Sequence, residues 1–130
     1  MTIEHVAVWV RDLNRMRLFY ETYFGAVAND RYVNSRTAFS SYFLRFPGGG
    51  ARLEIMQMPG IQENQPDGLT QWMGFTHLAV SVGSERAVDA LTDQLRTDGY
   101  TIADGPRRTG DGYYESVVLD PEQNRVEITA

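Results

Sequence analysis

The sequence predicts an α+β fold in which one β-α-β-β-β module occurs twice, at residues 1–58 and 75–130, joined by a linker over 59–74. Three observations predict it: an internal repeat, one amphipathic helical segment in each half, and runs of β-branched and aromatic residues after each helix. We therefore expect a single domain of 130 residues, with curved mixed sheets around a central cavity.

The repeat is visible at the start and at the end of each half. Ile3–Val10 is similar to Phe75–Val82, which lies 72 residues later. Arg52–Ile55 is similar to Arg125–Ile128, which lies 73 residues later, so the register shifts by only one residue across half of the chain. Glycine and proline punctuate the segment between the halves, as is typical of a linker.

The helical segments are predicted from apolar spacing and from signals at their ends. In the first half Asp12 can cap the start and Gly25 can close the end, and in the second half Ser84 and Gly99 take these positions. The apolar stripe of the first helix is Leu13, Met16, Tyr20, Tyr23 and Phe24, and that of the second is Val88, Leu91, Thr92 and Leu95.

Two strand-like runs follow each helix. They cover residues 40–46 and 52–58 in the first half, and 114–119 and 125–129 in the second. Turn-forming residues separate the members of each pair, at 47–50 and 120–124. A weaker strand is predicted before each pair, near 26–32 and near 101–103.

Composition excludes several classes of function. A net charge of −5 argues against nucleic-acid and anionic-membrane partners, which need a basic surface. The sequence has no apolar run that could span a bilayer and no signal-peptide pattern, so we expect a cytoplasmic protein. Because cysteine and lysine are both absent, thiolate zinc sites and lysine Schiff-base chemistry are excluded. Histidines, carboxylates, hydroxyls and arginines remain for chemistry.

Alternation along the predicted strands places four polar side chains opposite the core. His5 and His77 alternate with the apolar residues of the first strand in each half, and Glu54 and Glu127 do so in the last strand. Taken singly, each is typical of a packed or solvated side chain. However, these are the only two histidines of the chain, and both the histidines and the glutamates occupy equivalent repeat positions. This selectivity favours one shared metal site.

The four ligands indicate a divalent metal ion and Lewis-acid chemistry. Two imidazoles and two carboxylates without sulfur suit Zn or Ni, and also Co, Mn or Fe(II). A cation that binds a substrate oxygen acidifies the neighbouring C–H bond and stabilises the resulting enediolate. A ligand glutamate that leaves the cation can take the proton. We predict Glu127 as this base and Glu54 as the second choice, because the repeat does not separate them.

At these residues the chain resembles the vicinal-oxygen-chelate superfamily, which includes glyoxalase I, fosfomycin-resistance transferases, methylmalonyl-CoA epimerase, extradiol dioxygenases and bleomycin-binding proteins. The motifs that carry the resemblance are His5-Val6-Ala7-Val8, Phe19-Tyr20, Phe24-Gly25, His77-Leu78-Ala79, and Asp120-Pro121 followed by Asn124-Arg125-Val126-Glu127. The complete His, Glu, His, Glu set is most similar to glyoxalase I, or lactoylglutathione lyase. The resemblance implies a metal-dependent lyase or isomerase of a small α-oxygenated carbonyl compound, working as a homodimer.

Four further residues are candidates for substrate binding. Trp9 shares the face of His5 and favours an apolar or ring-bearing substrate, although it can equally fill a sheet interface. Arg107 and Arg108, in a glycine-rich loop over 105–112, can bind a carboxylate or phosphate, or can simply be solvated. The glycines can let this loop close over the site. Tyr113 can line the pocket, or can serve in the core or a subunit contact.

Two alternatives to the lyase remain open. The first is a binding protein of the same fold that sequesters a drug or metabolite without turnover. The second is a metal-dependent epimerase or transferase. The fold alone does not separate them, since one fold supports several chemistries.

Overall fold

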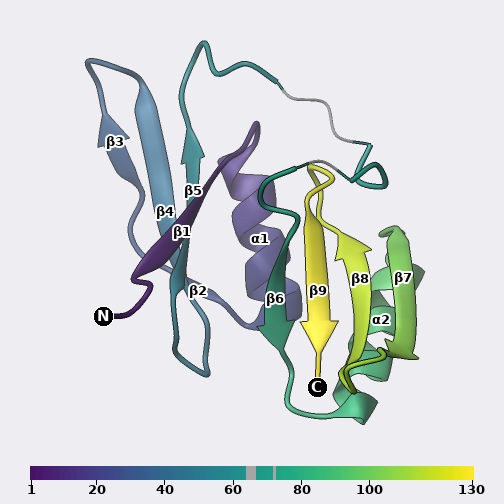
Figure 1. The fold of residues 1–130 in the computed structure, drawn as a ribbon. Coiled ribbons are helices and arrows are strands. Elements are labelled where there is room, and N and C mark those ends of the chain that lie inside the picture. The colour runs from purple at the N-terminus through teal and green to yellow at the C-terminus, as the bar shows by residue number, and fades with distance from the viewer. Residues whose placement is uncertain (64–66, 72) are drawn as a thin grey trace. The chain divides into compact units, whose positions relative to one another are not determined.

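The computed structural model describes residues 1–63, 67–71 and 73–130. The chain divides into two compact units, Met1–Asn64 and Gln65–Ala130, and each contains one sheet and one helix (Figure 1). The predicted α+β class is therefore confirmed. Part of the predicted linker, residues 64–66 and 72, lies outside the described residues. Among the described residues, no helix has the length and apolar character needed to cross a membrane.

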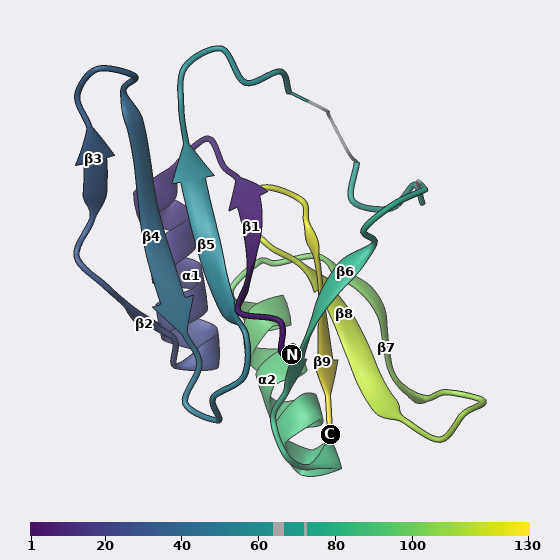
Figure 2. The same ribbon diagram turned by 60° about the vertical axis from the view of Figure 1, so that its left-hand side comes forward.

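The first unit is a sheet with α1 packed on one face (Figure 2). Its elements are β1 (His5–Trp9), α1 (Leu13–Phe24), β2 (Val27–Ala28), β3 (Tyr32–Asn34), β4 (Phe39–Arg45) and β5 (Arg52–Gln57). The strand order is β1-β5-β4-β2, with β3 also paired to β4. Only the β1–β5 pair is parallel, so the first and last strands of the module lie side by side in the same direction.

The second unit repeats this arrangement (Figure 1). Its elements are β6 (His77–Ser81), α2 (Glu85–Thr97), β7 (Ile102–Arg108), β8 (Tyr114–Leu119) and β9 (Arg125–Thr129). The strand order is β6-β9-β8-β7, and β6 pairs with β9 in parallel as β1 does with β5. The first and last strands of each module are thus neighbours, and these are the strands that carry the histidines and glutamates.

The helix ends follow the predicted capping chemistry. The Asp12 side chain accepts hydrogen bonds from the backbone N–H groups of Asn14 and Arg15, and Gly25 closes α1 in the left-handed conformation at φ 62°. In α2 the Ser84 hydroxyl accepts from the Ala87 N–H, and the C-cap is Asp98, one residue before the predicted Gly99, which follows it at φ 89°.

Apolar side chains between helix and sheet form the core of each unit. In the first unit they include Leu13, Met16, Phe19, Tyr20, Leu44, Leu53 and Ile55, and in the second Val88, Leu95, Val118, Val126 and Ile128. A buried polar pair lies within the second core, where the Thr92 and Ser116 hydroxyls are 2.6 Å apart. The strand faces that bear His5, Glu54, His77 and Glu127 are the faces opposite the core, because the alternate residues are buried on β5 and β9 and half-buried on β1 and β6.

Two strand predictions differ from the structure. The weak strand expected near 26–32 is divided into β2 and β3. Between these two strands the side chain of Asn29 replaces the backbone as a partner of β4, since its oxygen accepts a hydrogen bond from the Phe43 N–H at 2.7 Å. The weak strand expected near 101–103 is too short, since β7 continues to Arg108. Register shifts on either side of Asp104 allow β7 to stay paired with β8 through the glycine and proline that follow.

Gly105 is a structural residue of β7 and so lies outside the turn that remains of the predicted 105–112 loop. That the other glycines let this loop close stays a prediction. The φ of Gly105 is 75°, and a methyl group added there would lie 2.5 Å from the Glu115 carbonyl oxygen and 2.9 Å from Ser116 Cα. Only glycine allows this approach of β7 to β8.

We expect Gly105→Ala to lower the free energy of unfolding by about 3 kcal/mol, because the new methyl group strains the backbone and pushes against β8. Urea unfolding followed by circular dichroism measures the change. Gly110→Ala is the matched control, since nothing lies within 4 Å of a methyl group there. Equal stability of the two variants would contradict the close approach.

Candidate metal centre

Each unit brings one histidine next to one glutamate. In the first unit His5 Nε2 lies 3.8 Å from Glu54 Oε2, and in the second His77 Nε2 lies 3.4 Å from Glu127 Oε2. The parallel strand pairs produce this contact, because Glu54 is registered with Ala7 and Glu127 with Ala79, two residues beyond each histidine. Each unit thus brings its own histidine and glutamate into contact.

The surroundings of His5 leave one ring nitrogen free to act as a ligand. His5 Nδ1 is hydrogen-bonded to the Glu4 carboxylate. The pKa of Glu4 is lowered, chiefly by this hydrogen bond and further by Arg52, so Glu4 is ionised and can only accept. In the neutral imidazole the proton then lies on Nδ1 and the lone pair on Nε2, which faces Glu54. The Phe43 ring, edge-on to His5 at a centroid distance of 5.3 Å, packs beside the imidazole.

The spacing of both pairs fits two ligands of one divalent cation. At 3.4 and 3.8 Å the contacts are longer than an ordinary hydrogen bond. Nitrogen and oxygen ligands at about 2.0–2.2 Å from a cation lie about 3 Å apart when adjacent, so small side-chain adjustments bring either pair to that spacing. The glutamate side chains are mostly covered, at 13% and 17% exposure, whereas the imidazoles of His5 and His77 are open at 40% and 35%.

One pair alone does not complete a metal site. Across residues 1–63, 67–71 and 73–130, no three His, Asp or Glu side chains form a group able to hold a metal ion. Because the two pairs belong to different units, their convergence on one cation stays a prediction.

Glu115 is a carboxylate that the sequence analysis missed. It lies on β8 opposite Thr129, and Val117 of the same strand lies opposite Glu127, so both glutamates are on one face of the sheet. The pKa of Glu115 is raised, first by burial and then by the charge of Glu127. Alternation along 114–119 was the signal for it, but the repeat offers no equivalent carboxylate in the first half.

Arg107 and Arg108 lie in β7 and not in the predicted loop, because pairing with β8 extends through both. Arg107 is bonded to Asp104, with Nε to Oδ2 at 2.8 Å, and lies 4.0 Å from Glu115. Arg108 pairs with Glu85. Both guanidinium groups therefore have carboxylate partners, and a substrate anion would have to compete with them. Their role in binding substrate stays a prediction.

Trp9 and Tyr113 are both exposed. Trp9 is 41% exposed and lies on the face of β1 that bears His5, as alternation predicts. Tyr113 is 59% exposed in the turn between β7 and β8, where its backbone N–H donates to the Thr109 hydroxyl. Their contact with substrate stays a prediction.

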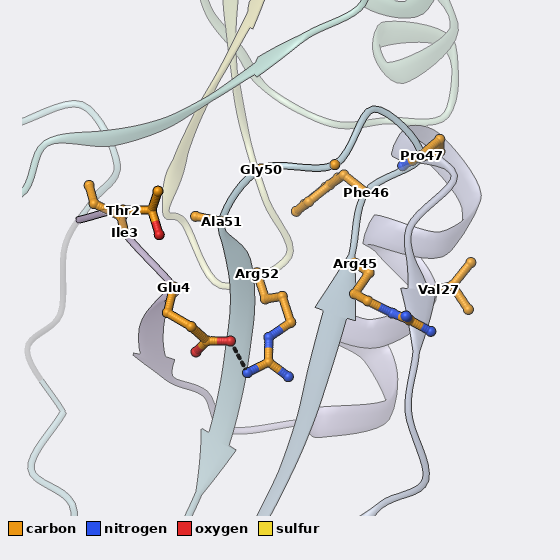
Figure 3. A pocket seen from close by; sticks show the side chains of 11 residues that line it. Thr2, Ile3, Glu4, Val27, Arg45, Phe46, Pro47, Gly50, Ala51 and Arg52 are labelled. Atoms are coloured by element: carbon orange, nitrogen blue, oxygen red, sulfur yellow. Dashed lines mark hydrogen bonds and ion pairs between the residues drawn. The ribbon is translucent and has the colours of Figure 1, made fainter.

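A hollow of about 810 Å³ lies at the end of the first sheet, beside the turn between β4 and β5 (Figure 3). The Glu4–Arg52 ion pair forms one side, and Val27, Phe46 and Pro47 contribute apolar surface. Neither His5 nor Glu54 lines it, although Glu4 connects the two places through its bond to His5. The hollow was not foreseen from the sequence, because it depends on the shape of the turn.

Comparison with known proteins places the whole chain in one family. The family model for the Glyoxalase/Bleomycin resistance protein/Dioxygenase superfamily matches residues 2–128. No curated protein matches the chain.

Solved structures share the fold across nearly the full chain. A glyoxylase/bleomycin resistance protein/dioxygenase domain from Frankia sp. EAN1pec is 21% identical, with 99% of this chain and 96% of that chain covered and a TM-score of 0.80. A possible glyoxalase from Bacillus cereus is 25% identical, with coverage of 100% and 99% and a TM-score of 0.70. The trypanothione-dependent glyoxalase I of Leishmania major is 20% identical, with coverage of 99% and 86% and a TM-score of 0.76.

Proposed function

The chain belongs to the glyoxalase/bleomycin resistance protein/dioxygenase superfamily, and on this premise we propose that it is a metal-dependent lyase or isomerase of the glyoxalase I type. Its substrate is a small α-oxygenated carbonyl compound. The observation that supports this most strongly is the His–Glu pair in each unit, at equivalent positions and with equivalent spacing. The proposed function requires both pairs to act together, because one pair alone supplies only two ligands.

In this proposal His5, Glu54, His77 and Glu127 hold one divalent cation, either Zn or Ni. The donor set fits such an ion because it combines two imidazole nitrogens with two carboxylates and contains no sulfur. A bound cation supplies positive charge beside the substrate oxygens and so makes the adjoining C–H bond more acidic.

Glu127 moves the proton. Its carboxylate removes a proton from the carbon that bears the hydroxyl group and returns it to the neighbouring carbonyl carbon. The hydroxyl oxygen also loses its proton and the former carbonyl oxygen gains one, so two protons and one electron pair move between the adjacent carbons. One carbon is oxidised and the other reduced, and no oxidant or second reactant is consumed. Glu54, the equivalent residue in the first unit, would hold the ion and take no part in the proton transfer. Within this proposal the protein acts as a cytoplasmic homodimer, with no nucleic-acid or membrane partner.

The test combines metal content with turnover. We expect the purified protein to bind Ni or Zn at one ion per chain and to isomerise the hemithioacetal of methylglyoxal and glutathione. EDTA should abolish turnover, and added Ni or Zn should restore it. Turnover that EDTA leaves unchanged would contradict the proposal.

Two other results would favour one of the alternative functions over the lyase. Metal at one ion per chain without isomerisation of any α-oxygenated carbonyl compound would favour an epimerase or transferase. A protein that stays free of metal when offered Ni or Zn, yet retains a small molecule through purification, would favour the binding protein.

A further inference from the structure

We infer that Trp9, Tyr32 and Phe39, here called the aromatic cluster, bind an uncharged aryl group of the substrate. The inference rests on the proposed function in one respect: the same ligand carries its oxygen atoms at the other end, toward His5 and Glu54. It adds a substrate class, aryl-substituted α-oxygenated carbonyl compounds, to that function.

Strand pairing places the aromatic cluster on the sheet face of the first His–Glu pair. Trp9 lies four residues after His5 on β1, so the two side chains are on the same face of the strand. On β4, Phe39 alternates with Ser41 and Phe43, and Phe43 is registered with Glu54. On β3, Tyr32 is registered with Ser41, so three strands contribute rings to one surface.

The rings contact one another edge-to-face in one pair and at a tilt in the other. Trp9 and Phe39 are perpendicular, with centroids 6.1 Å apart, and Tyr32 is tilted by 57° against Phe39 at 6.0 Å. Trp9 is 41% exposed and Tyr32 is 54% exposed. Because neither contact is a face-to-face stack and both Trp9 and Tyr32 are partly exposed, the cluster offers apolar surface on which another planar group can stack.

A small residue separates this surface from the ligand pair. Ala7 stands between His5 and Trp9 on β1 and is registered with Glu54. Trp9 is registered with Met56, so the cluster begins one alternation from Glu54, or about 7 Å along the strands. That distance is about the width of one aryl ring and its attached carbon. A ligand with oxygen atoms at His5 and Glu54 would therefore extend its ring over Ala7 toward Trp9.

The corresponding surface of the second unit has a different character. Ser81 takes the place of Trp9, two alternations beyond His77. Ser81 is registered with Thr129 of β9, and Thr129 is registered with Glu115 of β8. Glu115 is in turn registered with Arg107 of β7, so the next two positions across the sheet are charged. Around Trp9 the registered neighbours are Met56 and Ser41, which are neutral. An uncharged ring therefore fits the first unit and not the second.

The test uses three probes that separate the ring from the metal. These are 2-naphthohydroxamate, which has a ring and two metal-binding oxygens, acetohydroxamate, which has the oxygens alone, and 2-naphthamide, which has the ring without a hydroxamate. Isothermal titration measures the Kd of both hydroxamates for Ni-loaded wild type, Trp9→Ala and Tyr32→Ser. Leu18→Ala, a 53% exposed apolar residue of α1, is the matched control. Circular dichroism and Tm confirm that each variant is folded.

We expect wild type and Leu18→Ala to bind 2-naphthohydroxamate about tenfold more tightly than acetohydroxamate, and this ratio to fall toward one in Trp9→Ala and Tyr32→Ser. The Kd of acetohydroxamate should stay unchanged in all four proteins. A ratio that survives both cluster substitutions overturns the inference. The inference is also overturned if Trp9→Ala disrupts a dimer but keeps this affinity ratio, because the cluster would then be a contact between subunits.

Failure of the proposed function is distinguishable. If the protein binds no metal, 2-naphthamide is titrated into the metal-free protein and binding is followed by NMR. The reporter is the indole N–H resonance of Trp9, which is identified by its absence from the spectrum of Trp9→Ala. A shift of that signal, with binding weakened in Tyr32→Ser, supports the aromatic cluster although the lyase proposal has failed. No shift overturns the inference as well.

Discussion

Replacing Glu127 by glutamine is expected to lower kcat about 10²- to 10⁴-fold, because glutamine cannot accept the proton that Glu127 takes from carbon. The amide oxygen can still face His77, so the variant should stay folded and keep a bound metal ion. Steady-state isomerisation of the hemithioacetal measures the loss, and metal analysis of the same sample shows that the ion is retained.

Two matched variants make this result specific. Glu54→Gln changes the equivalent residue of the first unit and should reduce kcat less than Glu127→Gln, since Glu54 acts only as a ligand. Glu122→Gln, in the turn between β8 and β9, is the same chemical change outside the site and should leave kcat unchanged. A larger loss in Glu54→Gln than in Glu127→Gln would assign the base to the first unit.

Removal of either imidazole should weaken metal binding by more than about 100-fold, because changes in the partners of metal ligands already cost about 10–100-fold. We expect His5→Ala and His77→Ala to have this effect while the Tm of the metal-free protein stays within a few degrees of wild type, since neither residue belongs to the core. Competition with a chromogenic chelator measures the affinity. Ser81→Ala, on the same face of β6 as His77, is the control.

The double variant tests whether both histidines bind the same ion. If they do, His5→Ala with His77→Ala should bind little more weakly than either single variant, because one lost ligand already disables the site. Independent sites would behave differently. Each single variant would then keep one ion at wild-type affinity, and only the double variant would lose both.

Local signals explain the parts of the fold that the sequence predicts well. Strands β8 and β9 begin and end where the apolar and β-branched runs do, and both helices have the predicted caps. The exception is the C-cap of α2, which is Asp98, one residue before the predicted Gly99. The other features depend on neighbouring residues only. The length of β7 depends instead on hydrogen bonds to β8 across a hairpin, and the glycine and proline within it are typical of a loop when considered alone. Long-range pairing therefore overrides the local pattern there.

The site shows the same division. The His5–Glu54 and His77–Glu127 contacts follow from alternation together with the repeat, and the parallel pairing of first and last strands brings each pair together. Glu115 has no counterpart in the first half, so the repeat does not single it out. The contacts of Phe39 and Tyr32 with Trp9 require the registers of β4 and β3, which no local pattern contains.

The most direct measurement is anomalous X-ray diffraction from crystals of the protein loaded with Ni or Zn. We expect one anomalous peak per chain, within bonding distance of the His5 and His77 Nε2 atoms and of the Glu54 and Glu127 carboxylates. Two peaks, each beside a single His–Glu pair, would contradict the shared site, and so would a fully loaded crystal whose peaks lie away from all four side chains.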